Sequence, residues 1–180
     1  MAVEPALLQE VESVFEAATS RAATPLDQPP PPVLDSHQQT DGDHGRIEVR
    51  ATCEAFDRTV AYLKERTQFG VAIGSFQALQ HRMARLFVEI ELLKSAVAAA
   101  LEALDNDAAE ASQLASLAKA RASDLSERAL NEAAQLHGGI GVTDEFDLGL
   151  FLKRGRVLQQ TFGDGAYHRR RYAALLGFAA

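Results

Sequence analysis

The stretch KERTQFGVAIGSFQALQHRMA, residues 64–84, links two long helical patterns through a break that runs from residue 67 to residue 75. The break contains Gly70 and Gly74, and glycine is favoured where a chain must turn because it lacks a Cβ atom. So short a connection predicts that the helices on either side are antiparallel neighbours. Arg66, two glutamines and Phe69 lie in or beside the break, and a plain turn between two helices would not require these charged, polar and aromatic side chains.

Apolar residues recur every three or four positions on both sides of the break, as on one face of a helix. Upstream, we expect a helix from about 46 to 66, with a face formed by Val49, Cys53, Phe56, Val60 and Leu63. The downstream helix carries Phe76, Leu79, Met83, Leu86, Ile90, Leu93, Val97, Leu101 and Leu104. This second helix is apolar beyond one face, because Phe87, Val88 and Leu92 lie beside the stripe. We therefore expect it to be buried on most sides or to meet another subunit.

A third helix follows the turn DNDAAE, residues 105–110. Asp107 is expected to cap this helix, with Glu110 three residues on, as in a capping box. The helix is expected to stop at Gly138 and Gly139, where glycine permits the left-handed geometry of a helix end. Its apolar face consists of Leu114, Leu117, Leu125, Ala129, Ala133 and Leu136.

Shorter helical segments complete the chain. Thr143, followed by two acidic residues, is expected to start a short helix, because acids favour the positive end of the helix dipole. Helical patterns also span 151–161 and 166–176, and no strand pattern competes with them. The expected fold class is all-α, an antiparallel helical bundle with two extra helices at its C-terminal end.

The charge of the 180-residue chain is unevenly distributed: residues 1–45 hold eight acids and one base, and 46–180 hold seventeen of each, giving −7 in total. An acidic balance argues against a protein that binds nucleic acid through a basic face. No apolar run reaches the length of a membrane span, and Cys53, the only cysteine, cannot form an internal disulfide. Because the start MAVEPALLQE lacks the pattern of a secretion signal, we expect a cytoplasmic protein.

Three regions are expected along the chain. Residues 1–22 have apolar positions at helical spacing and are expected to form an amphipathic helix. Residues 23–45 are interpreted as a proline-rich acidic linker, since four successive prolines favour an extended polyproline segment. Residues 46–180 form the helical domain. The linker residues His37, Asp41, Asp43 and His44 have no established metal-ligand spacing, and we expect no metal site.

Three motifs lie at characteristic positions in the helical domain: RTQFG with IGSFQALQHR at the break, QLHGGIG from residue 135, and FGDGAYHR from residue 162. Together they resemble the C-terminal helical domain of the acyl-CoA dehydrogenase family, over about residues 46 to 178. The resemblance implies a domain at the core of a dimer or tetramer, with the ADP half of FAD at a subunit interface. It also implies oxidation of an acyl-CoA to an enoyl-CoA, in which a carboxylate removes the α proton and the flavin accepts the β hydride.

The resemblance assigns FAD contacts on both sides of the break. By this likeness Arg66 holds the pyrophosphate, for which its planar fork of donors is suited, with Gln68 nearby. Phe69 offers an apolar surface to the cofactor, and Gln77 matches a position that hydrogen-bonds FAD. An alternative stays open, in which Arg66 only stabilises the C-terminal end of a helix and Phe69 fills the hinge.

The stretch QLHGG comprises Gln135, Leu136, His137, Gly138 and Gly139. It resembles the family segment that approaches the ADP part of FAD from the neighbouring subunit. Two glycines remove the Cβ atoms that would keep a backbone away from a phosphate or ribose. The alternative is an ordinary glycine helix stop. On either interpretation His137 is expected to be a loop residue rather than a catalytic base.

The loop Phe162-Gly163-Asp164 departs from the commoner family pattern, which places the catalytic glutamate here; this chain has none. The form FGDxxYH instead resembles small subunits of heteromeric dehydrogenases that oxidise steroid side-chain CoA thioesters. Asp164, Asp41 or Asp43 could be proposed as a substitute, but each is one methylene shorter than glutamate, and proton abstraction tolerates little misplacement. The catalytic base therefore stays unassigned.

Two hypotheses about function follow. The family normally has a helical domain and a β-domain before this region, whereas only 45 residues precede it here, so we expect no complete site in this chain alone. The first hypothesis is an FAD-binding acyl-CoA dehydrogenase subunit that acts on an acyl-CoA in a homo- or hetero-oligomer with a dehydrogenase-type subunit. The second is a non-catalytic assembly subunit. Arg169, Arg170 and Arg171 could serve an interface or a phosphate, or only complement a helix end.

Overall fold

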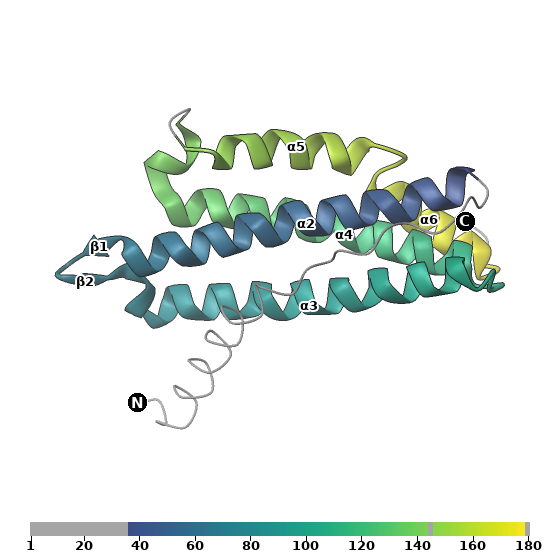
Figure 1. Ribbon diagram of the computed structural model, residues 1–180, viewed down its shortest axis with the longest axis horizontal. Coiled ribbons are helices and arrows are strands. Elements are labelled where there is room, and N and C mark those ends of the chain that lie inside the picture. Colours follow the sequence, from purple (N-terminus) through teal and green to yellow (C-terminus); the bar gives the residue numbers. More distant parts are fainter. Residues whose placement is uncertain (1–35, 144–145, 179–180) are drawn as a thin grey trace, which may run out of the picture.

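Three long antiparallel helices form the body of the protein (Figure 1). The computed structural model describes residues 36–143 and 146–178, with side chains described from Ile47 onward except Val142. The helices are α2 (Ser36–Glu65), α3 (Gln77–Asp105) and α4 (Ala111–His137). The expected all-α bundle is confirmed, and the apolar faces expected from the sequence meet in one core that includes Phe56, Leu63, Leu86, Leu93 and Leu125.

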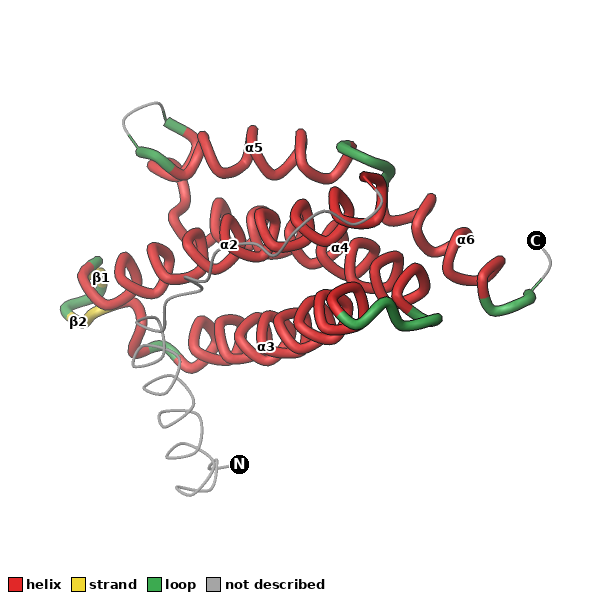
Figure 2. The backbone as a smooth tube through the Cα atoms, turned by 45° about the vertical axis from the view of Figure 1, so that its right-hand side comes forward, coloured by secondary structure: helices red, strands yellow, loops and turns green. Residues whose placement is uncertain are grey.

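Helix α4 is the central element. It packs on α2 and α3 on one side and on α5 (Leu148–Gln160) and α6 (Gly165–Leu175) on the other. As Figures 1 and 2 show, α3 and α5 lie at opposite edges of the molecule. Alanines and serines dominate the buried face of α4, so its backbone lies close to its neighbours. None of the described helices is long and apolar enough to cross a membrane.

The break after α2 folds as a minimal β-hairpin, an element that the sequence analysis did not include. Strands β1 (Thr67–Gln68) and β2 (Val71–Ala72) pair antiparallel, and a 3₁₀ turn η2 (Ile73–Ser75) leads into α3. The two loop residues Phe69 and Gly70 both have positive φ, 55° and 80°. A two-residue loop with this conformation is the type I′ turn that matches the twist of a hairpin.

The end of α4 agrees with the sequence. Gly138 follows the last helical residue at φ 64°, ψ −143°, a conformation that is almost restricted to glycine. A 3₁₀ segment η3 (Gly138–Val142) then carries the chain toward α5. Helix α6 begins at an N-cap, because the Asp164 carboxylate accepts a hydrogen bond from the Tyr167 backbone N–H at 2.7 Å.

Three local expectations are wrong. Helix α2 begins at Ser36, so residues 36–45 are helical rather than linker; this stretch contains no proline, and a helix already formed downstream can extend through it. Asp107 does not cap α4: it lies at φ 48°, and the N-cap is Glu110, which makes no side-chain cap hydrogen bond. Thr143 lies outside the helices, and α5 begins at Leu148. The amphipathic helix expected at 1–22 and the linker up to residue 35 lie outside the described residues.

Candidate functional site

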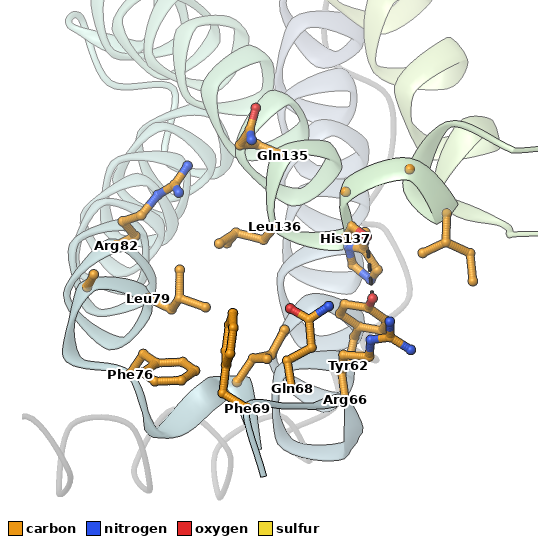
Figure 3. A pocket seen from close by; sticks show the side chains of 15 residues that line it. Tyr62, Arg66, Gln68, Phe69, Phe76, Leu79, Arg82, Gln135, Leu136 and His137 are labelled. Atoms are coloured by element: carbon orange, nitrogen blue, oxygen red, sulfur yellow. Dashed lines mark hydrogen bonds between the residues drawn. The ribbon is translucent and has the colours of Figure 1, made fainter. Parts of the chain in front are cut away.

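A cleft of about 780 Å³ opens where the end of α2, the hairpin, the start of α3 and the end of α4 converge (Figure 3). Eight of the nine residues to which the sequence analysis assigned cofactor contacts line it together. They are Arg66, Gln68, Phe69, Gln135, Leu136, His137, Gly138 and Gly139. The two motifs are about seventy positions apart in the sequence, so only the antiparallel bundle brings them to one place.

Arg66 is the first residue after α2, and its backbone is held firmly. Its N–H donates to the Tyr62 carbonyl and its carbonyl accepts from the Ile73 N–H, both at 2.8 Å. The guanidinium is exposed, and in the described part of the chain no carboxylate pairs with it. A fixed backbone carrying an unpaired guanidinium can bind an anionic ligand without first breaking an internal ion pair.

Phe69 lies at the tip of the hairpin and is 90% exposed. Its ring meets Phe76 edge to face at a centroid distance of 6.2 Å, and both rings line one side of the cleft (Figure 3). A positive φ at a bulky residue is uncommon, and such conformations are found preferentially at functional sites. The two aromatic side chains give the cleft an apolar wall opposite its polar one.

The QLHGG stretch forms the polar wall. We expected His137 to be a loop residue, and this expectation is wrong. His137 is the last residue of α4 and only 3% exposed. Its ring stacks on Tyr62 at 4.3 Å and contacts Phe146 at 4.8 Å. The turn that follows is open: a Cβ atom placed on Gly138 or Gly139 would meet nothing within 4 Å. A ligand can therefore approach this backbone closely.

The chemistry of His137 is that of a neutral structural group. Its Nδ1 lies 2.8 Å from the Ala133 carbonyl, which can only accept, so Nδ1 carries the proton. Burial lowers the pKa of His137 below its ordinary value of 6.5, against the smaller raising effect of the Ala133 hydrogen bond. His137 therefore packs beneath the turn that follows it, against Tyr62 and Phe146.

Two lining residues were missed by the sequence analysis. The Tyr62 hydroxyl donates to the His137 carbonyl at 3.4 Å, so Tyr62 ties the end of α2 to the end of α4, one turn before Arg66. Arg82 adds a second cation to the cleft, but it is paired with Glu132. A signal for Tyr62 was available, since a residue four positions before Arg66 lies on the same helical face.

The start of α3 adds to the electrostatics of the cleft. Its N-cap residue Phe76 makes no side-chain cap hydrogen bond, and Ala78 and Leu79 of the first turn line the cleft. The N-terminus of a helix carries partial positive charge on backbone N–H groups without intrahelical partners. No acidic residue is among the described residues that line the cleft. The whole site favours a ligand that combines negative charge with a flat apolar part.

Comparison with known proteins agrees with this geometry. The family model described as "Acyl-CoA dehydrogenase, C-terminal domain" matches residues 41–176. The chain belongs to the acyl-CoA dehydrogenase family. Among its curated relatives, acyl-CoA dehydrogenase IpdE2 of Mycolicibacterium smegmatis is 40% identical over 127 residues, which are 71% of this chain and 39% of the relative. The probable acyl-CoA dehydrogenase YngJ of Bacillus subtilis is 36% identical, over 68% of this chain and 33% of its own length.

Solved structures of acyl-CoA dehydrogenases share the fold. An acyl-CoA dehydrogenase from Geobacillus kaustophilus matches with a TM-score of 0.75 at 27% identity, covering 78% of this chain and 37% of its own. A variant of Tcur3481-Tcur3483, described as a steroid ACAD, matches with a TM-score of 0.74 at 28% identity, covering 78% and 38%. This acyl-CoA dehydrogenase-family chain thus spans between a third and two fifths of the length of these relatives.

The residues of the cleft fit a flavin dinucleotide, the cofactor that the family implies. The Arg66 guanidinium, which has no ion-pair partner in the described part of the chain, suits a pyrophosphate, and the open backbone at Gly138 and Gly139 leaves room where side chains would stand. Gln77 does not line the cleft; it is half-buried in the first turn of α3. The assigned contact of Gln77 therefore has no support from the shape of the cleft.

The proposed substitutes for the catalytic base lie elsewhere. Asp164 caps α6, at the end of the bundle opposite the hairpin (Figure 1). The side chains of Asp41 and Asp43 are outside the described ones. The arginines after Asp164 serve the fold: Arg169 pairs with Asp124 at 2.5 Å and Arg171 donates to the Ser116 hydroxyl at 2.5 Å. The described part of this dehydrogenase-family chain has a cleft lined by eight of the assigned residues, and no catalytic base is assigned to it.

Proposed function

We propose that this chain is an FAD-binding subunit of an acyl-CoA dehydrogenase that acts together with a dehydrogenase-type partner subunit. The observation that carries the proposal is the convergence of Arg66 and the Gly138–Gly139 turn on one cleft, whose described lining residues include no acid. A helix stop and a hinge would need neither an unpaired guanidinium nor an open backbone at the same place. Family membership supports FAD as the ligand.

Each side chain of the cleft has a distinct binding role in this proposal. Arg66 would hold the pyrophosphate, and the first turn of α3, which has no side-chain cap, would add positive potential. Gly138 and Gly139 let the backbone approach the adenosine part, and Gln68 and Gln135 supply neutral hydrogen bonds. Phe69 and Phe76 exclude water from an apolar face. When bound, FAD supplies the acceptor for the β hydride of an acyl-CoA thioester.

The substrate proposed is a steroid-type acyl-CoA. Two observations on relatives support it: the steroid ACAD Tcur3481-Tcur3483 matches at 28% identity, and the FGDGAYH motif resembles small subunits of such enzymes. A partner subunit would provide the carboxylate base and the walls around the flavin ring and the acyl chain. This division explains why the chain can hold half of a cofactor site while its loop at Phe162 carries no glutamate.

A second candidate function is a non-catalytic assembly subunit. One observation favours it: Asp164, which stands in the loop where other family members carry glutamate, is engaged as the N-cap of α6. A helix N-cap stabilises a protein by about 1 kcal/mol, which accounts for Asp164 without any catalytic role. The retained cleft residues weigh against this candidate.

Flavin retention and substrate oxidation separate the two functions. The purified full chain is mixed with FAD, alone and with candidate dehydrogenase-type partners, and separated from free flavin by gel filtration. We expect protein-bound flavin, and reduction of an artificial electron acceptor by a steroid-type acyl-CoA only when the partner is present. A colourless protein under all conditions, with partner included, would reject the flavin role. Bound flavin with no dye reduction by any acyl-CoA would reject the dehydrogenase role.

A further inference from the structure

Helix α5 carries a stripe of exposed residues on the side that faces away from the bundle. Leu150, Lys153, Arg154 and Val157 lie three or four positions apart, as on one face of a helix, and all are exposed. We call these four residues the α5 stripe. The helix packs on α2 and α4 through its other side, and it lies at the edge of the molecule in Figures 1 and 2. Leu150 and Val157 are 65% and 56% exposed.

The charges of α5 are all of one sign. The helix contains three bases and no acid. Arg156 pairs with Glu127, whereas Lys153 and Arg154 form no ion pair within the described residues. Large aliphatic side chains exposed beside such cations favour a partner that combines an apolar face with acidic residues.

The N-terminal part of this chain has the complementary sequence pattern. Residues 4–16 contain four acids and no base, and their apolar positions have the spacing of an amphipathic helix. The predicted apolar face consists of Leu7, Leu8, Val11, Val14 and Phe15. Glu10 and Glu12 fall on either side of this face, as Lys153 and Arg154 do on either side of the line from Leu150 to Val157.

Two contacts fix where α5 lies along α2. The Lys119 ammonium donates both to the Glu48 carboxylate and to the Leu158 carbonyl, so the end of α5 lies beside Glu48. The start of α5 lies beside Arg58, because Arg58 donates to the Asp147 carboxylate at 3.2 Å. At 1.5 Å per residue, these positions are about 18 Å and about 33 Å along α2 from its first residue.

The chain between the acidic segment and α2 is long enough to reach the stripe. Residues 17–35 are nineteen positions that end directly before Ser36, the first residue of α2. At the polyproline spacing of about 3.1 Å per residue they could span about 60 Å, which exceeds the distance to either end of α5. The same chain can therefore supply the partner that the stripe favours.

The exposed face of α3 suits the acidic segment less well. Val88 and Leu92 are 53% and 54% exposed there, but Glu89 and Glu91 follow or precede them directly on the same helix. An acidic segment would meet like charges beside these aliphatic residues. Helix α5, which has no acid, imposes no such repulsion.

We propose that residues 4–16 dock on the α5 stripe of their own chain, with their apolar face over Leu150 and Val157 and their acids beside Lys153 and Arg154. Docking removes the two aliphatic side chains from water and gives both cations a carboxylate partner. Because the segment is tethered, its effective concentration at α5 is on the order of millimolar, so a weak contact is enough. This inference goes beyond flavin binding and does not depend on it.

The first test changes the apolar part of the stripe. Hydrogen exchange of the backbone amides of residues 7–16 is followed by mass spectrometry in the flavin-free full chain, for the wild type, Val157→Glu and Val88→Glu. The two valines are matched, since they are 56% and 53% exposed on α5 and α3. We expect exchange at least about threefold faster in Val157→Glu, because a carboxylate in the contact weakens docking, and an unchanged rate in Val88→Glu.

The second test reverses the charges. The pair of substitutions Lys153→Glu and Arg154→Glu places acids against the acidic segment and is expected to accelerate its exchange to a similar extent at low salt. Adding Glu10→Lys and Glu12→Lys restores opposite charges and should return the rate to within about twofold of the wild type. The buried amides of α4, measured in the same experiment, should exchange at the wild-type rate in every variant, which shows that the bundle is intact.

Four results would overturn the proposal. The first is exchange of residues 7–16 in the wild type that is as fast as in a synthetic peptide of the same sequence. The second is equal exchange in Val157→Glu and Val88→Glu. The third is failure of the charge-restored variant to recover its protection. The fourth is protection that disappears on dilution, which would mean docking on a second copy. Since flavin is absent throughout, these outcomes are independent of whether the chain binds FAD.

Discussion

A buried lysine near the start of α4 and an exposed arginine beside its end differ in how their positive charge is satisfied. Near its start, Lys119 is fully buried, and its ammonium donates to the Glu48 carboxylate at 3.0 Å, the Ser123 hydroxyl at 3.0 Å and the Leu158 carbonyl at 2.9 Å. Near its end, Arg66, the first residue after α2, is exposed beside the Gly138 turn, with no carboxylate partner among the described residues. The Lys119 ammonium is hydrogen-bonded by the protein itself, and the Arg66 guanidinium is exposed.

The two cations therefore have different roles in the protein. A buried ammonium must have its donors satisfied, so the Lys119 group holds α2, α4 and α5 together. The saturation is still incomplete on the acidic side, because Glu48 Oε2 has no hydrogen-bond partner. Burial raises the pKa of Glu48 to about 7, against the lowering effect of Lys119. The exposed Arg66 guanidinium has no ion-pair partner among the described residues, so its side chain is not needed to hold the helices together.

The largest expected effect is on stability at the buried end. Lys119→Met should lower the free energy of unfolding by about 3 to 5 kcal/mol, because it removes the counter-ion of the buried Glu48 and also the donor to the Ser123 hydroxyl and the Leu158 carbonyl. Urea unfolding at neutral pH measures it. The double variant Glu48→Met with Lys119→Met should recover at least half of the loss, since apolar replacement of a buried pair is often neutral. As a surface control, Arg156→Met breaks the exposed pair with Glu127 and should cost less than about 1 kcal/mol. A loss at Lys119 no larger than this control would erase the contrast between the two ends.

The next effect is on binding at the open end. Arg66→Gln should weaken FAD binding roughly 10- to 100-fold, equivalent to about 1.5 to 3 kcal/mol for lost charge-assisted hydrogen bonds. The thermal midpoint should stay unchanged, because the side chain is exposed and has no described ion-pair partner. Titration of the full chain with FAD, followed by flavin fluorescence, measures the affinity. Equal affinity of the two proteins would mean that the unpaired guanidinium has no part in binding.

A smaller effect on stability is expected at the Gly138 turn. Gly138→Ala should lower stability by roughly 1 to 2 kcal/mol, because alanine is strained at φ 64° although space is available. Gly139→Ala is the matched control, since its φ is not positive and its added Cβ also meets nothing within 4 Å. Thermal or urea unfolding of both variants compares them. Indistinguishable variants would show that the turn tolerates a side chain equally at both positions.

The smallest effect concerns pH and His137, the last residue of α4. Because its folded-state pKa is below the ordinary 6.5, the unfolded chain binds a proton more readily. The stability contributed by neutral His137 is therefore complete above about pH 6.5 and is lost as the pH falls below that value. His137→Gln should remove this part of the slope, so the stability difference between wild type and variant should shrink from pH 7.5 to pH 5.5. A difference that is constant across this range would contradict the assignment.

Much of the bundle could be predicted because its signals are local. The faces containing Phe56, Leu86 and Leu125 follow from helical spacing, and Gly138 ends α4 because few other residues adopt its conformation. The turn before α4 could not be predicted as well. Asp107 and Glu110 match a capping box in sequence, but the chain makes one more turn before the helix starts, and φ 48° at Asp107 excludes the cap.

The candidate site was predicted only in part for the same reason. Eight assigned residues meet in the cleft, whereas Gln77 does not line it, because the turn η2 sets where α3 begins and how it is rotated. Tyr62 was missed because its importance comes from His137, which is 75 positions away. The Lys119–Glu48 pair, 71 positions apart, was missed on the same ground. The contact between Lys119 and Glu48 leaves no trace in local spacing, whereas Tyr62 could have been indicated by its place one helical turn before Arg66.

Local signals in the sequence were enough to predict the long antiparallel helices, the breaks at residues 67–75 and at Gly138, and the family motifs at those breaks. These features follow from periodicity and backbone preference within a few residues. Local signals did not predict that Lys119 is buried and Arg66 exposed. This difference follows from how α2, α4 and α5 pack, because desolvation and hydrogen bonding at Lys119 and Arg66 are set by neighbours from distant parts of the chain.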